Sequence, residues 1–163
     1  MSAGSSTPDW REVPQFGSRP AARRSTVRPS AYAFLRDRAG RVAVVRAIDG
    51  IFLPGGGIEN GESPEEAVVR EALEECGLVL RVGACVSRVV QFVVTAEGES
   101  VEKRCAFFAA RIERANRAAM LPGHETLWLG PASAALTLKH ESQMWAVRAW
   151  MKFRGAPWRR GLS

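Results

Sequence analysis

The sequence has few cysteines and no long apolar segment, and each absence excludes a class of protein. Its 163 residues include only Cys76, Cys85 and Cys105, an odd number without paired metal-ligand spacing. This excludes a disulfide framework as the organising element, and we expect reduced thiols packed inside the protein. No run of about 18 apolar residues is present, so no segment is expected to span a membrane. The first residues also lack the apolar core of a secretory signal, which favours a cytoplasmic location.

What the sequence does contain is the composition of one ordinary globular domain. Hydrophobic residues make up 46% of the chain and charged residues 25%, as in soluble proteins that bury a core. The net charge is +6, but the excess lies at the two ends. Residues 1–28 carry five arginines against two acids, residues 148–163 carry five cations and no acid, and the segment between them is slightly acidic. This distribution does not favour nucleic acid as the primary partner.

The distribution of proline, glycine and apolar residues divides the chain into three parts. Residues 1–27 are rich in Ser, Pro, Arg, Gly and Ala, which predicts an irregular basic arm that can dock through Trp10, Val13 and Phe16. Residues 28–154 form the predicted domain, and residues 155–163 form a basic C-terminal tail.

Apolar periodicity within the domain predicts a mixed fold. The predicted strands are residues 30–35, 42–45, 51–53, 78–82, 86–94, 102–112 and 127–129, and the first two are expected to form a hairpin. The predicted helices are residues 64–76, 131–138 and 142–153. Strands before and after a central helix, with helices at the end, indicate an α/β (α+β) fold with a mixed sheet between helical layers.

The helix at residues 64–76 has both of its ends encoded. Ser63 is a good N-cap, Pro64 suits the first helical position, and Glu66 completes a capping box with Ser63. Gly77 stands where a C-cap glycine is expected.

Acidic residues are concentrated on this helix. Because residues three or four apart share a helix face, Glu71 stands beside both Glu74 and Glu75. Converging carboxylates are ligands that Mg²⁺ or Mn²⁺ prefers, and the glycines at 55–57 let backbone approach a ligand closely. The alternative is a solvated acidic face, since glutamate is a good helix former.

The full spacing resembles the Nudix box of the MutT-like Nudix hydrolases from end to end. The pattern is Gly56, five residues, Glu62, seven residues, then the nine residues 70–78 with sequence REALEECGL. Every fixed position of the box is matched, and the surrounding strand pattern extends the resemblance to residues 28–153.

The resemblance implies a sandwich of helices around a mixed sheet, of α/β/α type, and metal-dependent hydrolysis of a phosphoanhydride. By position, Glu71, Glu74 and Glu75 would bind the metal together with the carbonyl of Gly56, and Arg70 would orient them by pairing with Glu62. The general base would be Glu71 or Glu74. The expected cofactor is Mg²⁺ or Mn²⁺.

Residues outside the box supply weaker candidates. Some family members place a further catalytic glutamate outside the box, and Glu125 is the best candidate here; otherwise it is an exposed loop acid. Lys103 and Arg104 could contact phosphates, or lie on a solvated strand face. Phe52 could stack on a base, although core packing is an alternative use.

The expected substrate is a small nucleotide, either a nucleoside triphosphate or a dinucleoside polyphosphate, because residues 28–32 and 139–147 resemble small Nudix proteins assigned to those substrates. Two alternatives stay open: a Nudix-fold regulatory module that binds a nucleotide without cleaving it, and an RNA-associated pyrophosphohydrolase that uses the basic termini. A homodimer is compatible with the sequence.

Overall fold

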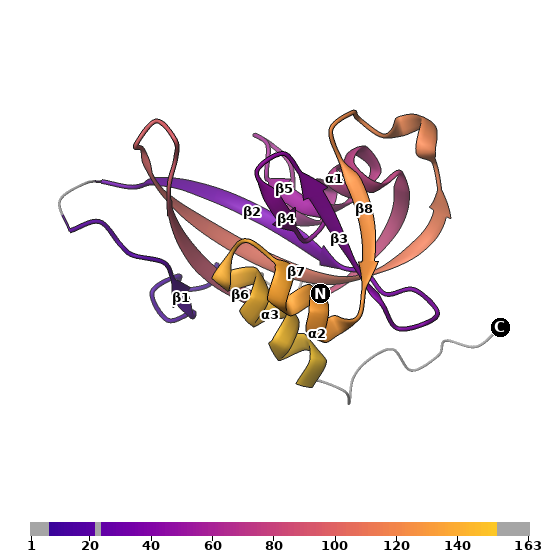
Figure 1. The fold of residues 1–163 in the computed structure, drawn as a ribbon. Coiled ribbons are helices and arrows are strands. Elements are labelled where there is room, and N and C mark those ends of the chain that lie inside the picture. Colours follow the sequence, from indigo (N-terminus) through magenta and orange to yellow (C-terminus); the bar gives the residue numbers. More distant parts are fainter. Residues whose placement is uncertain (1–6, 22–23, 153–163) are drawn as a thin grey trace, which may run out of the picture.

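The computed structural model describes residues 7–21 and 24–152 and arranges them as two β-sheets with three α-helices (Figure 1). The predicted tail at 155–163 and Phe153 lie outside the described residues. The strands are β1 (Gln15–Phe16), β2 (Thr26–Phe34), β3 (Val42–Ala47), β4 (Gly50–Phe52), β5 (Gly55–Gly57), β6 (Leu78–Val94), β7 (Ser100–Ala115) and β8 (Glu125–Leu129). The helices are α1 (Pro64–Cys76), α2 (Pro131–Thr137) and α3 (Glu141–Lys152), with a short 3-10 helix at Arg117–Ala119.

The larger sheet is mixed, as predicted. Its strand order is β1-β6-β7-β2-β5, in which β1 runs parallel to β6 and β2 parallel to β7, while the other neighbours are antiparallel. The smaller sheet has the order β4-β3-β8 and is antiparallel. The mixed α+β architecture expected from the sequence is confirmed. None of the described helices is long and apolar enough to cross a membrane.

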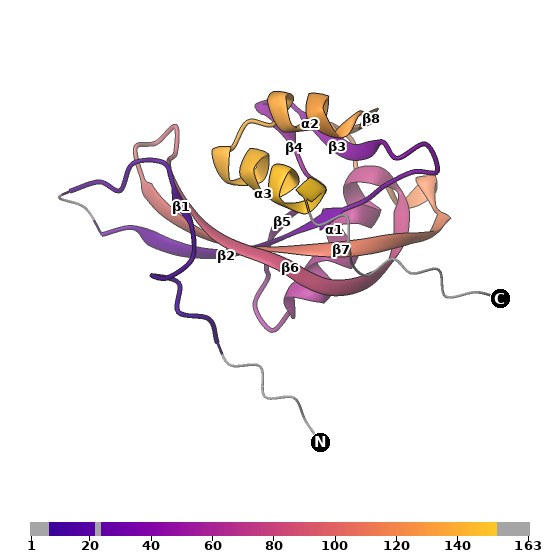
Figure 2. The same ribbon diagram turned by 90° about the horizontal axis from the view of Figure 1, so that it is seen from below.

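Period-two alternation along the central strands builds a core on each face of the larger sheet. Tyr32 and Phe34 of β2 belong to the cluster that packs under α2 and α3, whereas Ala31 and Ala33 belong to the cluster that packs under α1. Because successive side chains of a strand point to opposite faces, the sheet separates the two layers of helices. Figure 2 shows α2 and α3 together on one side of β2, β6 and β7.

The predicted hairpin between residues 30–35 and 42–45 is wrong. Both segments are strands, but β2 pairs with β5 and β7, and β3 pairs with β4 and β8 in the other sheet. Only a bridge between Arg36 and Val42 joins them near the turn. The physical reason is that both segments are apolar on both faces, so neighbours distant in sequence compete successfully with the local partner.

The other differences concern strand length and two short strands, β1 and β5, that the sequence did not predict. The runs predicted at 78–82 and 86–94 form one long strand, β6, whose pairing with β7 shifts register between Val82 and Cys85 and again before Ser87. These irregularities coincide with the small residues Gly83, Ala84 and Cys85 that separate the two apolar runs. Helix α1 has the predicted boundaries, with the capping box of Ser63 and Glu66 and a left-handed Gly77 at its end.

The N-terminal arm docks on the free side of β6. Phe16 lies 5.9 Å from the ring of Trp145 on α3, and Gln15 pairs in register with Val90. The guanidinium of Arg104 lies 5.9 Å from the ring of Trp10. Among the described residues of the predicted arm, Gln15–Phe16 form β1 and Thr26–Val27 begin β2, and Trp10 and Phe16 contact the domain.

The stacked rings under α3 provide a test of this packing. Phe34 is 1% exposed and stacks on Phe107 at 5.6 Å and on Trp150 at 4.6 Å. We expect Phe34→Ala to lower the free energy of unfolding by about 3–5 kcal/mol, because it leaves a cavity between sheet and helix. Urea denaturation measures the change. Ile48→Ala is the control: Ile48 is fully exposed, and a change beyond about 0.5 kcal/mol is not expected there.

Candidate functional site

The loop and helix from residue 56 to 76 are organised around the guanidinium of Arg70. It donates to both carboxylate oxygens of Glu62, at 2.8 and 3.0 Å, and to the Gly57 carbonyl at 3.0 Å. It also reaches Glu71 at 3.0 Å and Glu74 at 3.4 Å. The hydrogen bonds to Arg70 lower the pKa of the Glu62 carboxyl, and the same bonds raise the pKa of Arg70. One cation therefore fixes the loop to the helix and offsets the repulsion among three carboxylates.

The glycine at position 56 lets the Glu71 carboxylate lie directly against the backbone. A Cβ atom at Gly56 would stand 2.6 Å from the Oε1 atom of Glu71, a distance that real side chains do not tolerate. At Gly57 the same atom would meet nothing within 4 Å. The close approach is therefore specific to Gly56, and it brings the main chain and a box carboxylate to one place.

Glu75, on the same helix, points towards β5. Its carboxylate accepts a hydrogen bond of 3.0 Å from the backbone N–H of Gly55. Burial, with the added repulsion of Glu71 and Glu74, raises the pKa of Glu75 to about 8 despite that hydrogen bond. The environment of Glu75 thus disfavours its negative charge, and a nearby cation would relieve it.

The donor set fits a divalent cation in chemistry, although its side chains are not arranged as a finished cage. Among the described residues, no three His, Cys, Asp or Glu side chains are grouped so that they could hold a metal as they stand. Glu71 and Glu74 each form an ion pair with Arg70, so their carboxylates are directed to its guanidinium. Ion binding by Glu71, Glu74, Glu75 and the Gly56 carbonyl therefore requires small rearrangements of side chains that already lie on one helix and one adjoining loop.

Glu125 lies in the smaller sheet, where it pairs with Arg46 at 2.8 Å in an exposed position. It also lines a cavity of about 400 Å³ beside the end of α1, together with Cys76, His124, Thr126 and other residues. The Nδ1 atom of His124 is buried there without a hydrogen-bond partner. The structure therefore places Glu125 near the last turn of α1. Glu71 and Glu74 are connected instead by Arg70, which pairs with both.

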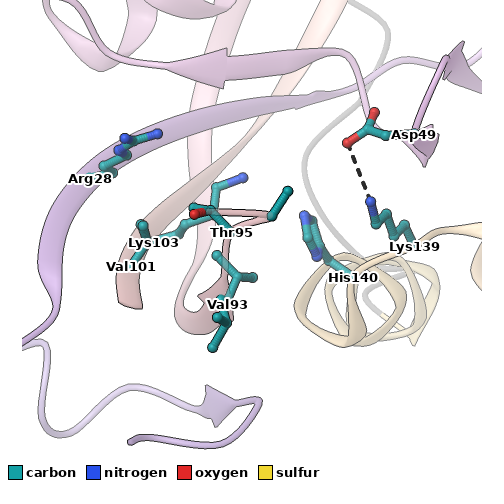
Figure 3. A pocket seen from close by; sticks show the side chains of 10 residues that line it. Arg28, Asp49, Val93, Thr95, Val101, Lys103, Lys139 and His140 are labelled. Atoms are coloured by element: carbon teal, nitrogen blue, oxygen red, sulfur yellow. Dashed lines mark hydrogen bonds and ion pairs between the residues drawn. The ribbon is translucent and has the colours of Figure 1, made fainter. Parts of the chain in front are cut away.

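Lys103 and Arg104, which are adjacent in sequence, point to opposite faces of β7. Arg104 pairs with Glu102 at 2.9 Å and lies under Trp10 of the N-terminal arm. Lys103 instead lines a cavity of about 670 Å³ that opens between the strands and the segment before α3 (Figure 3). The alternation of a strand decides this difference, so only Lys103 of the pair faces an open cavity.

Three cavity-lining residues were not singled out as individual candidates in the sequence: Arg28, Lys139 and His140. Figure 3 shows Arg28 and Lys103 on the strand side, with Lys139 and His140 on the side of α3. No spacing in the sequence links these positions, because β2, β7 and the loop before α3 meet only in the folded chain. Phe52, the candidate for base stacking, does not line the cavity. Its ring centre lies 5.4 Å from that of His140 and 5.7 Å from the Lys139 ammonium.

Comparison with solved structures shows the same fold in Nudix proteins. A Nudix hydrolase from Nitrosomonas europaea aligns with a TM-score of 0.66 at 17% identity, covering 82% of this chain and 94% of that one. A MutT protein from Methanosarcina mazei Go1 aligns with a TM-score of 0.61 at 19% identity, covering 80% and 98%. An Ap4A hydrolase from C. elegans, in a binary complex, aligns with a TM-score of 0.58 at 18% identity, covering 77% and 96%. No curated protein matches the chain.

The family model of the NUDIX domain matches residues 26–151, which is most of the chain and includes the whole loop and helix described above. The chain therefore belongs to the Nudix family, and its identification from the sequence as a Nudix hydrolase is confirmed.

Proposed function

We propose that the chain hydrolyses a phosphoanhydride bond in a nucleoside diphosphate-linked substrate with the help of Mg²⁺ or Mn²⁺. The observation that carries this proposal is the contact between Gly56 and Glu71, around which Arg70 holds Glu62 and Glu74. All the carboxylates that such chemistry requires are present on one short segment. A regulatory module that only binds nucleotide would not need this complete set.

Each residue of the segment has a distinct proposed role. A divalent ion held by Glu71, Glu74, Glu75 and the Gly56 carbonyl would offset the phosphate charge and lower the pKa of the attacking water. Glu71 or Glu74 would accept the proton from that water, and Arg70 would position both carboxylates. Glu125 stays a further candidate for the base, since it stands beside the end of the same helix.

A small nucleotide is the proposed substrate, either a nucleoside triphosphate or a dinucleoside polyphosphate. Support comes from the basic cavity beside the site and from the shared fold with a protein described as an Ap4A hydrolase. The RNA-associated alternative stays a prediction: the structure describes residues 7–21 and 24–28 of the basic N-terminal segment, whereas the basic tail at 155–163 lies outside the described residues. A cytoplasmic location and a homodimer stay predictions.

Removal of one box carboxylate tests the hydrolysis. We expect Glu74→Gln to lower kcat by about a hundredfold or more, because it removes a ligand or the base while keeping the side-chain shape. The assay is mass spectrometry of products formed with Mg²⁺ in ¹⁸O-labelled water, which also identifies the phosphorus that is attacked. The matched control is Glu65→Gln, an exposed glutamate of the same helix. Equal rates in both variants would contradict the assignment.

The two neighbouring glycines provide a test of the metal site that does not depend on turnover. We expect Gly56→Ala to weaken Mn²⁺ binding by about tenfold or more, since its Cβ displaces the Glu71 carboxylate. Gly57→Ala should bind Mn²⁺ like the unmodified protein, because its Cβ meets no atom. Isothermal titration calorimetry measures both. Because the displaced atoms end a flexible side chain, the unfolding midpoint of Gly56→Ala should change little, and identical affinities in the two variants would refute the site.

The raised pKa of Glu75 predicts a pH dependence of stability in the metal-free protein. The folded chain holds a proton on Glu75 up to about pH 8, whereas the ordinary value is 4.5. The stabilising contribution of Glu75 to the free energy of unfolding is therefore complete below pH 4.5 and is lost as the pH rises through about 8. We expect Glu75→Gln to flatten this loss. Thermal unfolding from pH 4 to 9 in chelator measures it, and parallel curves for the two proteins would contradict the prediction.

A further inference from the structure

The cavity in Figure 3 carries more positive than negative charge. Its lining includes Arg28, Lys103 and Lys139, against one acid, Asp49, which pairs with Lys139 at 3.3 Å. His140 also lines it, and burial together with the two lysines lowers the pKa of His140 to about 4, so that its ring is neutral at pH 7. Arg28 and Lys103 thus leave the cavity with two positive charges that no lining acid balances.

Lys103 is the least exposed of the three cations that line the cavity. Its Nζ atom lies 5.9 Å from the centre of the Tyr32 ring, and no acidic side chain among the described residues forms an ion pair with it. Burial, and then the repulsion of Arg28 and Lys139, lower the pKa of its ammonium. A half-buried cation without a carboxylate partner opposes folding, so its position at the cavity wall fits a role in binding an anion.

The cavity is poorly suited to a nucleobase. No Phe, Tyr or Trp is among its lining residues, which are otherwise Val, Ala and Thr. Stacking on an aromatic face is the usual way in which proteins hold a base, but the rings of Tyr32 and Phe52, which contact Lys103 and Lys139, are not among the lining residues. Several cations converging without a stacking surface favour a phosphate group.

The cavity adjoins the Nudix loop and helix through a short series of contacts. Lys103 stands over Tyr32, Tyr32 pairs in register with Gly55, and the Gly55 N–H donates to Glu75. Strand β2 therefore runs from the cation cavity, which Arg28 lines, to its pairing with β5 beside the proposed metal site.

We propose that this cavity binds a phosphate group of the substrate that is remote from the anhydride being cleaved, with Lys103 and Arg28 as its main contacts. This inference rests on the proposed hydrolysis for the identity of the substrate. The remote phosphate has two possible sources, namely additional phosphates in the chain of a dinucleoside polyphosphate or a phosphate on the ribose. Substrates with such a group are selected over those without it.

Two pairs of substrates that differ only in phosphate content test the selection. Diadenosine tetraphosphate is compared with diadenosine diphosphate, and NADPH with NADH, for the unmodified protein and for Lys103→Met. We expect kcat/KM to be higher for the phosphate-rich member of one pair, and that pair identifies the source. In Lys103→Met the KM of that member should rise by about tenfold to a hundredfold with kcat nearly unchanged, because one charge-assisted contact is lost. An equal effect on both members, or none, overturns the proposal.

Two features separate this test from failure of folding or of the proposed function. Methionine replaces the apolar stem of lysine up to its Cε atom and removes the charge, so the unfolding midpoint of Lys103→Met should not fall. Arg114→Met, eleven residues along the same strand and exposed, removes the same charge as a matched control.

If no substrate is turned over, calorimetric titration with inorganic tripolyphosphate in the absence of Mg²⁺ decides the question. Binding by the unmodified protein and by Arg114→Met, with loss in Lys103→Met, supports the cavity even though hydrolysis fails. Equal binding by all three proteins, or none by any, overturns it.

Discussion

The structure of residues 56–76 depends on the ion pairs and hydrogen bonds that the Arg70 guanidinium forms. Six glutamates lie between residues 62 and 75, and without a cation among them their repulsion would oppose both the helix and the turn that precedes it. Arg70 contacts Glu62, Glu71 and Glu74 and the Gly57 carbonyl at once. Its planar group, with five donors, can satisfy several acceptors in fixed directions, which the ammonium of a lysine cannot do. The acidic segment is thereby held in one shape before any ligand arrives.

The backbone of the loop also shapes the site. Glycine at position 56 removes the Cβ atom that would keep Glu71 away from the main chain, and the N–H of Gly55 supports Glu75. Both glycines belong to β5, which pairs with β2 at Tyr32 and Ala31. The sheet therefore sets the position of the loop, and the capped ends of α1 set the position of the glutamates.

Strand alternation assigns neighbouring residues to different tasks. On β7, Lys103 faces the cavity while Arg104 faces the N-terminal arm, although a sequence shows the two as one basic pair. On β2, Tyr32 and Phe34 enter one core and Ala31 and Ala33 enter the other. The same periodicity thus builds two layers of helix around one sheet and leaves a charged cavity at the edge of one layer.

Features that depend on residues close together in the chain could be predicted from the sequence. The boundaries of α1 and its capping box followed from spacings near the ends of the helix, because caps are local, and the box pattern in residues 56–78 indicated the family. The pairing of Arg70 with Glu62, eight residues apart, was implied by the resemblance to that family and is present in the structure. Three features required the folded chain: β2 and β3 lie in different sheets, Arg104 points away from the cavity, and one cavity is lined by Arg28, Lys103, Lys139 and His140. Strand pairing joins residues far apart in the chain, and apolar strands that can be buried on both faces have no local pattern that selects a partner.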